Sequence, residues 1–233
     1  MPIDAATRVC AVYGHPIGHS ASPAMQNAGM GALGLNWRYL AFDVRPEELG
    51  AAISGARTMG FIGLNLTLPH KVLAVDLVHC LDASARLWGA VNTIRFEAQD
   101  AGGGWQPLGH FPAPPVPPVR AKGFNTDAEA ITRAMREDLG IEVGGRSVLL
   151  LGCGGAGRTA ALKFASDGAA RLYLVNRTAA KAEQVRSEIS RRWPRVVVTL
   201  GYPPGEVDLI VNATPLGLRA GDPLPLDLRQ FPV

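Results

Sequence analysis

The sequence predicts an α/β protein with two sheet-forming halves. In the first half, short apolar runs typical of buried strands alternate with stretches whose apolar spacing is typical of helices, and such alternation favours a mainly parallel sheet. In the second half, a continuous apolar run at residues 148–151 breaks into clustered glycines and a helix-compatible stretch follows. The 233 residues are 47% apolar and 18% charged. This composition is ordinary for a globular chain, and the length allows one or two domains.

The elements of the first half are indicated by strand-like runs and by prolines at helix starts. The predicted strands are residues 9–13, 37–44, 61–66 and 91–96, and the predicted helices are residues 23–33, 46–57 and 71–78. Residues 97–121 break this pattern, because three glycines at 102–104 and five prolines between 112 and 118 oppose helix packing and central-strand pairing. We expect this stretch to be an insertion or an exposed loop.

The second half predicts a nucleotide-binding sheet. A helix is predicted over residues 128–139, followed by strands at residues 148–151, 172–175, 196–200 and 209–211. After the first of these strands, Gly152 permits a sharp turn, Gly154 lets the backbone approach a pyrophosphate, and Gly157 lets the next helix pack close to the strand. The N-terminus of that helix then favours the anion. We therefore expect a Rossmann domain with strand order 3-2-1-4; the alternative is a glycine-rich turn without a ligand.

The end of the second predicted strand of that sheet points to the type of cofactor. Where NAD enzymes usually carry an acidic residue for the ribose 2′-hydroxyl, the chain has Asn176, Arg177 and Thr178. Arg177 can pair with a 2′-phosphate through two N–H donors, Thr178 can add a hydrogen bond, and Lys181 lies three residues further on. The pattern favours NADP over NAD. The alternative is that Asn176 and Thr178 only cap the helix that starts near Ala179.

Other features narrow the classes of function. No apolar run approaches the ~20 residues that a membrane helix needs, and the N-terminus lacks the basic start of a secretory signal, so we expect a cytoplasmic protein without a membrane partner. Cys10, Cys80 and Cys153 are too few and too scattered for a disulfide framework or a zinc site, so no metal is predicted. The net charge of +3 without a dense basic block argues against nucleic acid.

Four polar clusters lie where predicted strands end or helices begin, which is where α/β sheets place ligand-binding groups. They offer hydroxyls, an amide, one lysine and one aspartate, a set that suits a small polyhydroxylated acid. Each cluster alone is also explained by helix starts, strand ends or caps. The clusters are G-H-P-I-G-H-S-A-S-P at residues 14–23, N-L-T-L-P-H-K at 65–71, G-A-V-N-T at 89–93 and G-F-N-T-D at 123–127.

Together with G-C-G-G-A at residues 152–156, N-R-T at 176–178 and N-A-T-P-L-G at 212–217, these clusters resemble in order the motifs of the shikimate dehydrogenase family. The resemblance covers residues 8–218 apart from the proline-rich stretch. It implies reversible, NADPH-dependent reduction of 3-dehydroshikimate to shikimate, a step of the shikimate pathway toward chorismate and the aromatic amino acids. The expected partner is then this small-molecule substrate, and no particular oligomeric state is predicted.

The resemblance implies a role for each half and for individual residues. Residues 1–125 would form a substrate-binding and catalytic α/β domain, and residues 126–233 an NADP-binding Rossmann domain. The implied catalytic pair is Lys71 and Asp127. The implied substrate ligands are Ser20, Ser22, Thr67, Asn92 and Asp127, and the implied cofactor ligands are Gly152, Gly154, Gly155, Ala156, Asn176, Arg177, Thr178 and Lys181.

The resemblance also implies segments beyond the end of this sequence. The family continues through two further strands, a tyrosine-bearing loop and a C-terminal helix with a glutamine, so we expect an incomplete Rossmann domain whose fourth strand is an unpaired edge. Two alternatives to the leading interpretation stay open. One is a quinate/shikimate dehydrogenase with relaxed cofactor choice, against which Arg177 argues, and the other is a relative that binds a ligand or partner without turnover.

Overall fold

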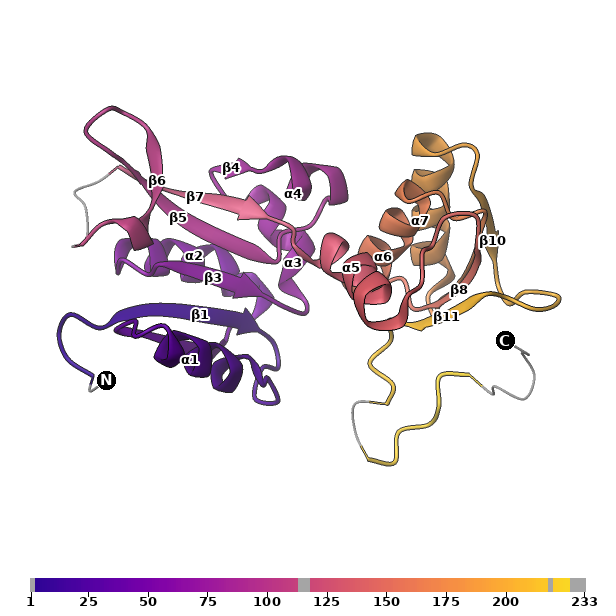
Figure 1. Ribbon diagram of the computed structural model, residues 1–233, viewed down its shortest axis with the longest axis horizontal. Coiled ribbons are helices and arrows are strands. Elements are labelled where there is room, and N and C mark those ends of the chain that lie inside the picture. Colours follow the sequence, from indigo (N-terminus) through magenta and orange to yellow (C-terminus); the bar gives the residue numbers. More distant parts are fainter. Residues whose placement is uncertain (1–2, 113–117, 218–219, 227–233) are drawn as a thin grey trace. The chain divides into compact units, whose positions relative to one another are not determined.

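The chain forms two α/β units, Met1–Thr126 and Asp127–Val233, each with a sheet of its own (Figure 1). The computed structural model describes residues 3–112, 118–217 and 220–226. The predicted α/β class is confirmed. Among the helices in these ranges, none has both the length and the apolar character needed to cross a membrane.

The first unit alternates strands and helices up to its fifth strand. Its elements are β1 (Arg8–Gly14), α1 (Ser22–Ala32), β2 (Trp37–Asp43), η1 (Pro46–Glu48), α2 (Leu49–Thr58), β3 (Gly63–Leu66), α3 (His70–Leu73), η2 (Ala74–Asp76), β4 (Cys80–Leu81), α4 (Ala83–Trp88), β5 (Thr93–Gln99), β6 (Trp105–Pro107), η3 (Leu108–His110) and β7 (Val119–Phe124). They form a seven-stranded sheet in the order β2-β1-β3-β5-β7-β4, with β6 paired to β5. The prediction missed β4 and α4. It also treated η1 and α2 as one helix over residues 46–57, and α3 and η2 as one helix over residues 71–78.

In this sheet every strand except β5 runs in the same direction, so the expectation of a mainly parallel sheet is confirmed with one exception. β1 runs parallel to β2 and β3, and β4 runs parallel to β7, but β5 is antiparallel to β3, β6 and β7. β5 and β6 are joined by a short hairpin, and a connection of this kind can join only antiparallel strands. β5 is therefore the strand that runs opposite to the other strands of the sheet.

The expected exposed insertion at residues 97–121 is wrong for most of its length. β5 extends to Gln99, β6 forms a hairpin with it, and β7 lies inside the sheet between β5 and β4. β7 alternates small or apolar residues with basic ones, and its Arg120 pairs at 2.7 Å with Glu97 of β5. Glu97 is only 1% exposed and also pairs with Arg95 of its own strand. The prolines that prompted the expectation are confined to residues 112–118, of which 113–117 lie outside the described residues.

The second unit has an all-parallel sheet. Its elements are α5 (Asp127–Leu139), β8 (Ser147–Leu151), α6 (Gly155–Ser166), β9 (Arg171–Val175), α7 (Ala179–Arg192), β10 (Val197–Leu200) and β11 (Leu209–Asn212). The strand order is β10-β9-β8-β11, which confirms the predicted order 3-2-1-4. The central strand β8 is buried from its second residue onward, as its unbroken apolar run indicates for a strand that is covered on both faces.

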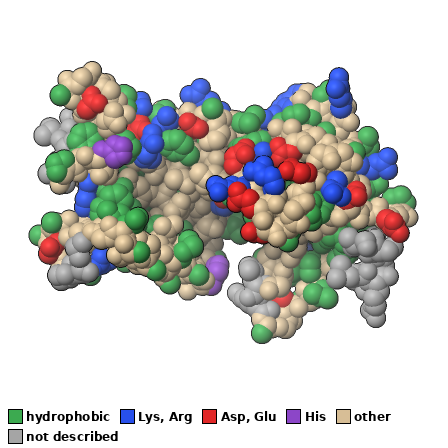
Figure 2. All heavy atoms as spheres, in the orientation of Figure 1, with side chains coloured by type: hydrophobic (Ala, Val, Ile, Leu, Met, Phe, Trp, Pro, Cys, Tyr) green, Lys and Arg blue, Asp and Glu red, His purple; other side chains and the backbone are tan. Residues whose placement is uncertain are grey.

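Acidic and basic side chains gather over the helices of the second unit (Figure 2). Several of them form ion pairs between helices. Lys163 of α6 pairs with Glu129 of α5 at 3.1 Å, and Arg158 of α6 pairs with Glu188 of α7 at 2.7 Å. These pairs tie the three helices to one another on the surface of the unit.

Candidate functional site

The glycine-rich turn between β8 and α6 is shaped by backbone that only glycine can supply. Gly152 has a φ of +98°, and a Cβ there would lie 2.8 Å from the carbonyl oxygen of Ala213. A Cβ on Gly157 would lie 1.9 Å from the carbonyl oxygen of Gly152, so the helix could not approach the strand as it does. At Gly154, by contrast, a Cβ would meet no described atom within 4 Å. The turn is thus closed on its inner side and open at Gly154.

The start of α6 offers unpaired backbone donors beside that opening. Gly154 is the N-cap residue, and no side chain in the described ranges caps the helix. The first turn holds no acidic residue, and the first intrahelical bond runs from the Arg158 N–H to the Gly154 carbonyl at 2.7 Å. The preceding N–H groups therefore have no partner within the helix, and together with the helix dipole they favour an anion. A pyrophosphate fits this chemistry.

Asn176 links this turn to the next one along the sheet edge. Its Oδ1 accepts a hydrogen bond from the Cys153 N–H at 2.8 Å, and its Nδ2 donates one to the Thr178 carbonyl at 2.8 Å. Thr178 is the N-cap residue of α7, but within the described residues neither its hydroxyl nor the Asn176 amide caps that helix. The capping alternative raised by the sequence is therefore wrong. The two turns at the carboxyl ends of β8 and β9 are held together by one amide side chain.

The basic groups of the second turn are exposed. Arg177, Thr178 and Lys181 all reach solvent, and Arg177 forms no ion pair with any residue that the structure describes. Such a cation can bind a phosphate without first breaking an ion pair within the protein. The residues present therefore fit NADP, because the N–H groups at the start of α6 suit a pyrophosphate and the basic groups of the turn after β9 suit a 2′-phosphate.

In the first unit, the hydroxyl-bearing motif residues lie after β1 and β3. Thr67 directly follows β3, and its N–H donates to the Tyr13 carbonyl at 3.0 Å. A Cβ on Gly14 would lie 2.5 Å from Thr67 Cγ2, so glycine is needed for the two segments to lie this close. At the start of α1, the Ser22 N–H donates to the Ser20 Oγ at 3.3 Å, which makes the two serines neighbours.

Asn92 and Lys71 are joined to the same region by backbone hydrogen bonds. The Asn92 carbonyl accepts from the Leu66 N–H at 2.8 Å, one residue before Thr67, and the Lys71 carbonyl accepts from the Val91 N–H at 2.7 Å. The structure therefore brings Asn92 beside Thr67 and Lys71, although it lies far from both in the sequence. Lys71 lies in the single-turn helix α3 and is half-buried.

The Asn92 side chain reaches the end of the unit. Its Nδ2 donates to the Thr126 Oγ1 at 2.9 Å, and its Oδ1 accepts from the Thr126 N–H at 3.0 Å. Asp127 follows Thr126 by one peptide bond and is the first residue of α5, which belongs to the second unit. The structure thus fixes the residue before Asp127 against the predicted substrate amide.

Sequence reasoning missed the buried residues that support these groups. His70, next to Lys71, is fully buried, and its Nε2 lies 2.8 Å from the Val44 carbonyl. Burial lowers the pKa of His70, so the ring is neutral and donates to that carbonyl. Tyr39 and Asn65 are a second example, because the tyrosine hydroxyl bonds to the amide. His70 and Asn65 both lie in the motif at residues 65–71, but no pattern in the sequence predicted their contacts.

A sequence model described as the shikimate dehydrogenase substrate binding domain matches residues 12–94. The protein named shikimate dehydrogenase (NADP(+)) from Methanopyrus kandleri is 38% identical over 230 residues, which are 96% of this chain and 72% of that protein. The chain belongs to the shikimate dehydrogenase family. Its match to the Methanopyrus protein extends through both units.

Solved structures of similar proteins agree with this assignment. The Thermus thermophilus shikimate 5-dehydrogenase in complex with NADP(H) and shikimate is 33% identical, with a TM-score of 0.70 over 91% of this chain and 70% of that one. The ligand-free 5-ketofructose reductase of Gluconobacter sp. strain CHM43 is 30% identical, with a TM-score of 0.69 over 91% of this chain and 70% of that one. These two similar structures are thus named for different substrates.

Proposed function

We propose that this protein is an NADP-dependent shikimate dehydrogenase that reversibly reduces 3-dehydroshikimate to shikimate. The observation that carries the proposal is the 38% identity to the Methanopyrus shikimate dehydrogenase (NADP(+)) over 96% of this chain. The chemistry of the described residues supports it, because hydroxyl, amide, ammonium and guanidinium groups stand at the ends of strands in both units. The substrate and cofactor are small molecules, and a cytoplasmic location is part of the same proposal.

In this proposal the second unit holds NADP. The N–H groups around Gly154, Gly155 and Ala156 at the start of α6 would bind the pyrophosphate, with Gly152 forming the turn. Arg177, Thr178 and Lys181 would bind the 2′-phosphate. Asn176 would serve both turns, since its amide already bonds to Cys153 and Thr178. When bound, NADPH supplies the hydride for the carbonyl carbon.

The first unit would hold the substrate. Ser20 and Ser22 at the start of α1 offer hydroxyls, and Thr67 and Asn92 offer a hydroxyl and an amide at the edge where β3 ends. A polyhydroxylated ring that carries a carboxylate needs donors and acceptors of this kind around it. Asp127 would add an acceptor for a substrate hydroxyl.

Lys71 and Asp127 would carry out the proton transfer. Addition of hydride to the carbonyl carbon builds negative charge on the oxygen, so a proton must be delivered there. The Lys71 ammonium would give this proton, and the Asp127 carboxylate would keep the lysine charged and oriented before the step. In the oxidation direction, neutral Lys71 would take the proton from the substrate hydroxyl, so protons and electrons balance in both directions.

A spectrophotometric assay tests the proposal. Purified protein is mixed with shikimate and NADP, and formation of NADPH is followed by its absorbance, with quinate as the competing substrate and NAD as the competing cofactor. We expect turnover with shikimate and NADP. Binding of both ligands by calorimetry without any NADPH formation would contradict the enzymatic proposal and favour a binding protein, and faster turnover of quinate would contradict the substrate assignment.

A further inference from the structure

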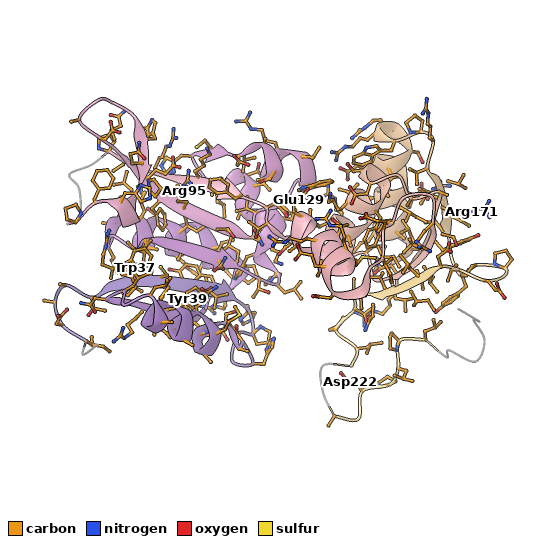
Figure 3. All side chains as sticks on the ribbon, viewed as in Figure 1. Trp37, Tyr39, Arg95, Glu129, Arg171 and Asp222 are labelled. Carbon is orange, nitrogen blue, oxygen red and sulfur yellow. The ribbon has the colours of Figure 1, made fainter. Side chains whose placement is uncertain are left out.

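Tyr39 occupies a buried position at the start of a line of polar side chains in the first unit. It lies on the edge strand β2, beside α1 and β1 (Figure 3), and only 3% of it is exposed. Its hydroxyl lies 2.6 Å from the Asn65 Oδ1 on β3, across the intervening strand β1. Burial raises the pKa of Tyr39 to about 12, so the hydroxyl keeps its proton at neutral pH and acts as the donor.

The remaining bonds fix the direction in which this line runs. The Asn65 Nδ2 faces the Asn92 carbonyl at 3.4 Å and the Thr93 Oγ1 at 3.1 Å. Because a carbonyl can only accept, the amide nitrogen must point toward Asn92 and the amide oxygen toward Tyr39. The Thr93 hydroxyl then accepts from Asn65 and donates to the Asn92 Oδ1 at 3.1 Å.

The line ends at the amide that the proposed function assigns to the substrate. The Asn92 Oδ1 receives the Thr93 hydroxyl and the Thr126 N–H, at 3.1 and 3.0 Å, so this oxygen points into the protein. The amide nitrogen donates one of its two hydrogens to the Thr126 Oγ1 at 2.9 Å, and its second hydrogen is the one that the proposed function assigns to the substrate. Four side chains, from Tyr39 to Asn92, therefore have a single consistent pattern of donors and acceptors.

Tyr39 is itself held from the open side of its strand. β2 pairs only with β1 among the described strands, so its outer edge is left without a strand partner. On that side the Asn27 Oδ1 of α1 accepts from the Tyr39 N–H at 2.9 Å, and the Asn27 Nδ2 donates to the Tyr39 carbonyl at 2.8 Å. The helix that begins at Ser22 is thus bonded to the backbone of Tyr39.

We propose that Tyr39 is a positioning residue of the substrate site, which acts through Asn65 and Thr93 to fix the side-chain amide of Asn92 in the orientation that binds shikimate. The inference rests on the proposed function. Without the tyrosine hydroxyl, the Asn65 amide oxygen loses its donor, and the position of that amide depends only on its contacts with Thr93 at 3.1 Å and the Asn92 carbonyl at 3.4 Å. Since Thr126 still holds Asn92, the expected result is weaker substrate binding and not loss of the site.

The test compares Tyr39→Phe with the matched variant Tyr13→Phe. Tyr13 is similarly buried on the neighbouring strand β1, burial raises its pKa to about 12 as well, and its hydroxyl has only a 3.5 Å contact with the Ala52 carbonyl. We expect the shikimate dissociation constant and KM of Tyr39→Phe to rise about threefold to tenfold, the effect of one buried hydrogen bond, with kcat and the NADP dissociation constant within about twofold of wild type. Tyr13→Phe should leave all four quantities unchanged.

Thr93→Val provides the second measurement, because it cuts the line between Asn65 and Asn92. This variant should weaken shikimate binding to a similar extent. The double variant with Tyr39→Phe should bind shikimate no more weakly than whichever single variant has the lower affinity. Equal shikimate affinity in Tyr39→Phe and wild type, or fully additive effects in the double variant, would overturn the inference while the proposed function stands. A wild-type protein that binds NADP but not shikimate would instead overturn the proposed function, and the inference with it.

Discussion

Replacing Arg177 by alanine separates recognition of the 2′-phosphate from recognition of the rest of the cofactor. Arg177 is exposed and has no ion-pair partner among the described residues, so its removal leaves no buried group unsatisfied and should not change the stability of the second unit. Hydrogen bonds to a charged group contribute ~1.5–3 kcal/mol each, which corresponds to about 10–150-fold in affinity. We expect NADP to bind more weakly by about this factor and NAD to bind as before.

Asn176→Ala is the matched variant for this experiment. The Asn176 amide bonds to both turns, so its removal should loosen the glycine-rich turn as well as the turn after β9. Both NADP and NAD should then bind more weakly, by a similar factor. Dissociation constants for the two cofactors are measured by titration calorimetry at one fixed ionic strength, because salt screens an exposed charge pair. The reasoning fails if Arg177→Ala weakens NADP and NAD equally.

Three further predictions concern catalysis, the turn and stability. Lys71→Ala should lower kcat by about 10²–10⁴-fold with the NADP dissociation constant within about threefold, and an unchanged kcat would remove Lys71 from the mechanism. Gly157→Ala should destabilise the second unit by about 3 kcal/mol or more, since the new Cβ would lie 1.9 Å from a carbonyl oxygen, whereas Gly154→Ala should unfold like wild type and bind NADP more weakly; thermal unfolding of both variants checks this. Glu97→Gln should cost ~2–4 kcal/mol at neutral pH, because burial opposes ionisation of Glu97 but its two arginines outweigh that effect and hold the pKa of the carboxyl below its usual value. Because its pKa is lower in the folded state, ionised Glu97 stabilises that state at pH values above its unfolded-state pKa of about 4.3, and this stabilisation is lost as the pH falls through the folded-state pKa. The urea midpoints of wild type and variant should therefore converge in acid. A difference that stays constant with pH would contradict this.

The sheet of the second unit was predicted almost strand for strand. Parallel strands that are covered on both faces consist of unbroken apolar residues, and residues 148–151 and 172–175 have this character. The close approach of Gly157 to the Gly152 carbonyl was predictable for a similar reason, because the two residues lie five positions apart. Local sequence patterns therefore suffice where the determining contacts are local.

The first unit shows where such patterns fail. β7 alternates small or apolar residues with basic ones, and its Arg120 is explained by Glu97 on the paired strand and by the Trp105 ring beneath its guanidinium. β4 has two residues and no pattern to detect. The bond from Tyr39 to Asn65 joins residues 26 positions apart and depends on the register of three strands. The candidate site could thus be predicted as a set of motifs, while the contacts that orient its groups required the structure.

The amide of Asn27 also has a consequence for association between chains. An open strand edge with exposed apolar side chains invites strand addition by another molecule and hence aggregation, and β2 exposes Leu40 and Phe42 by 45% and 38%. Near the centre of that edge, however, the N–H and carbonyl of Tyr39 are already bonded to Asn27. An incoming strand would have to break both bonds before it could continue the ladder. The Asn27 side chain of α1 thereby opposes the addition of a strand from another molecule at β2, the strand that carries Tyr39.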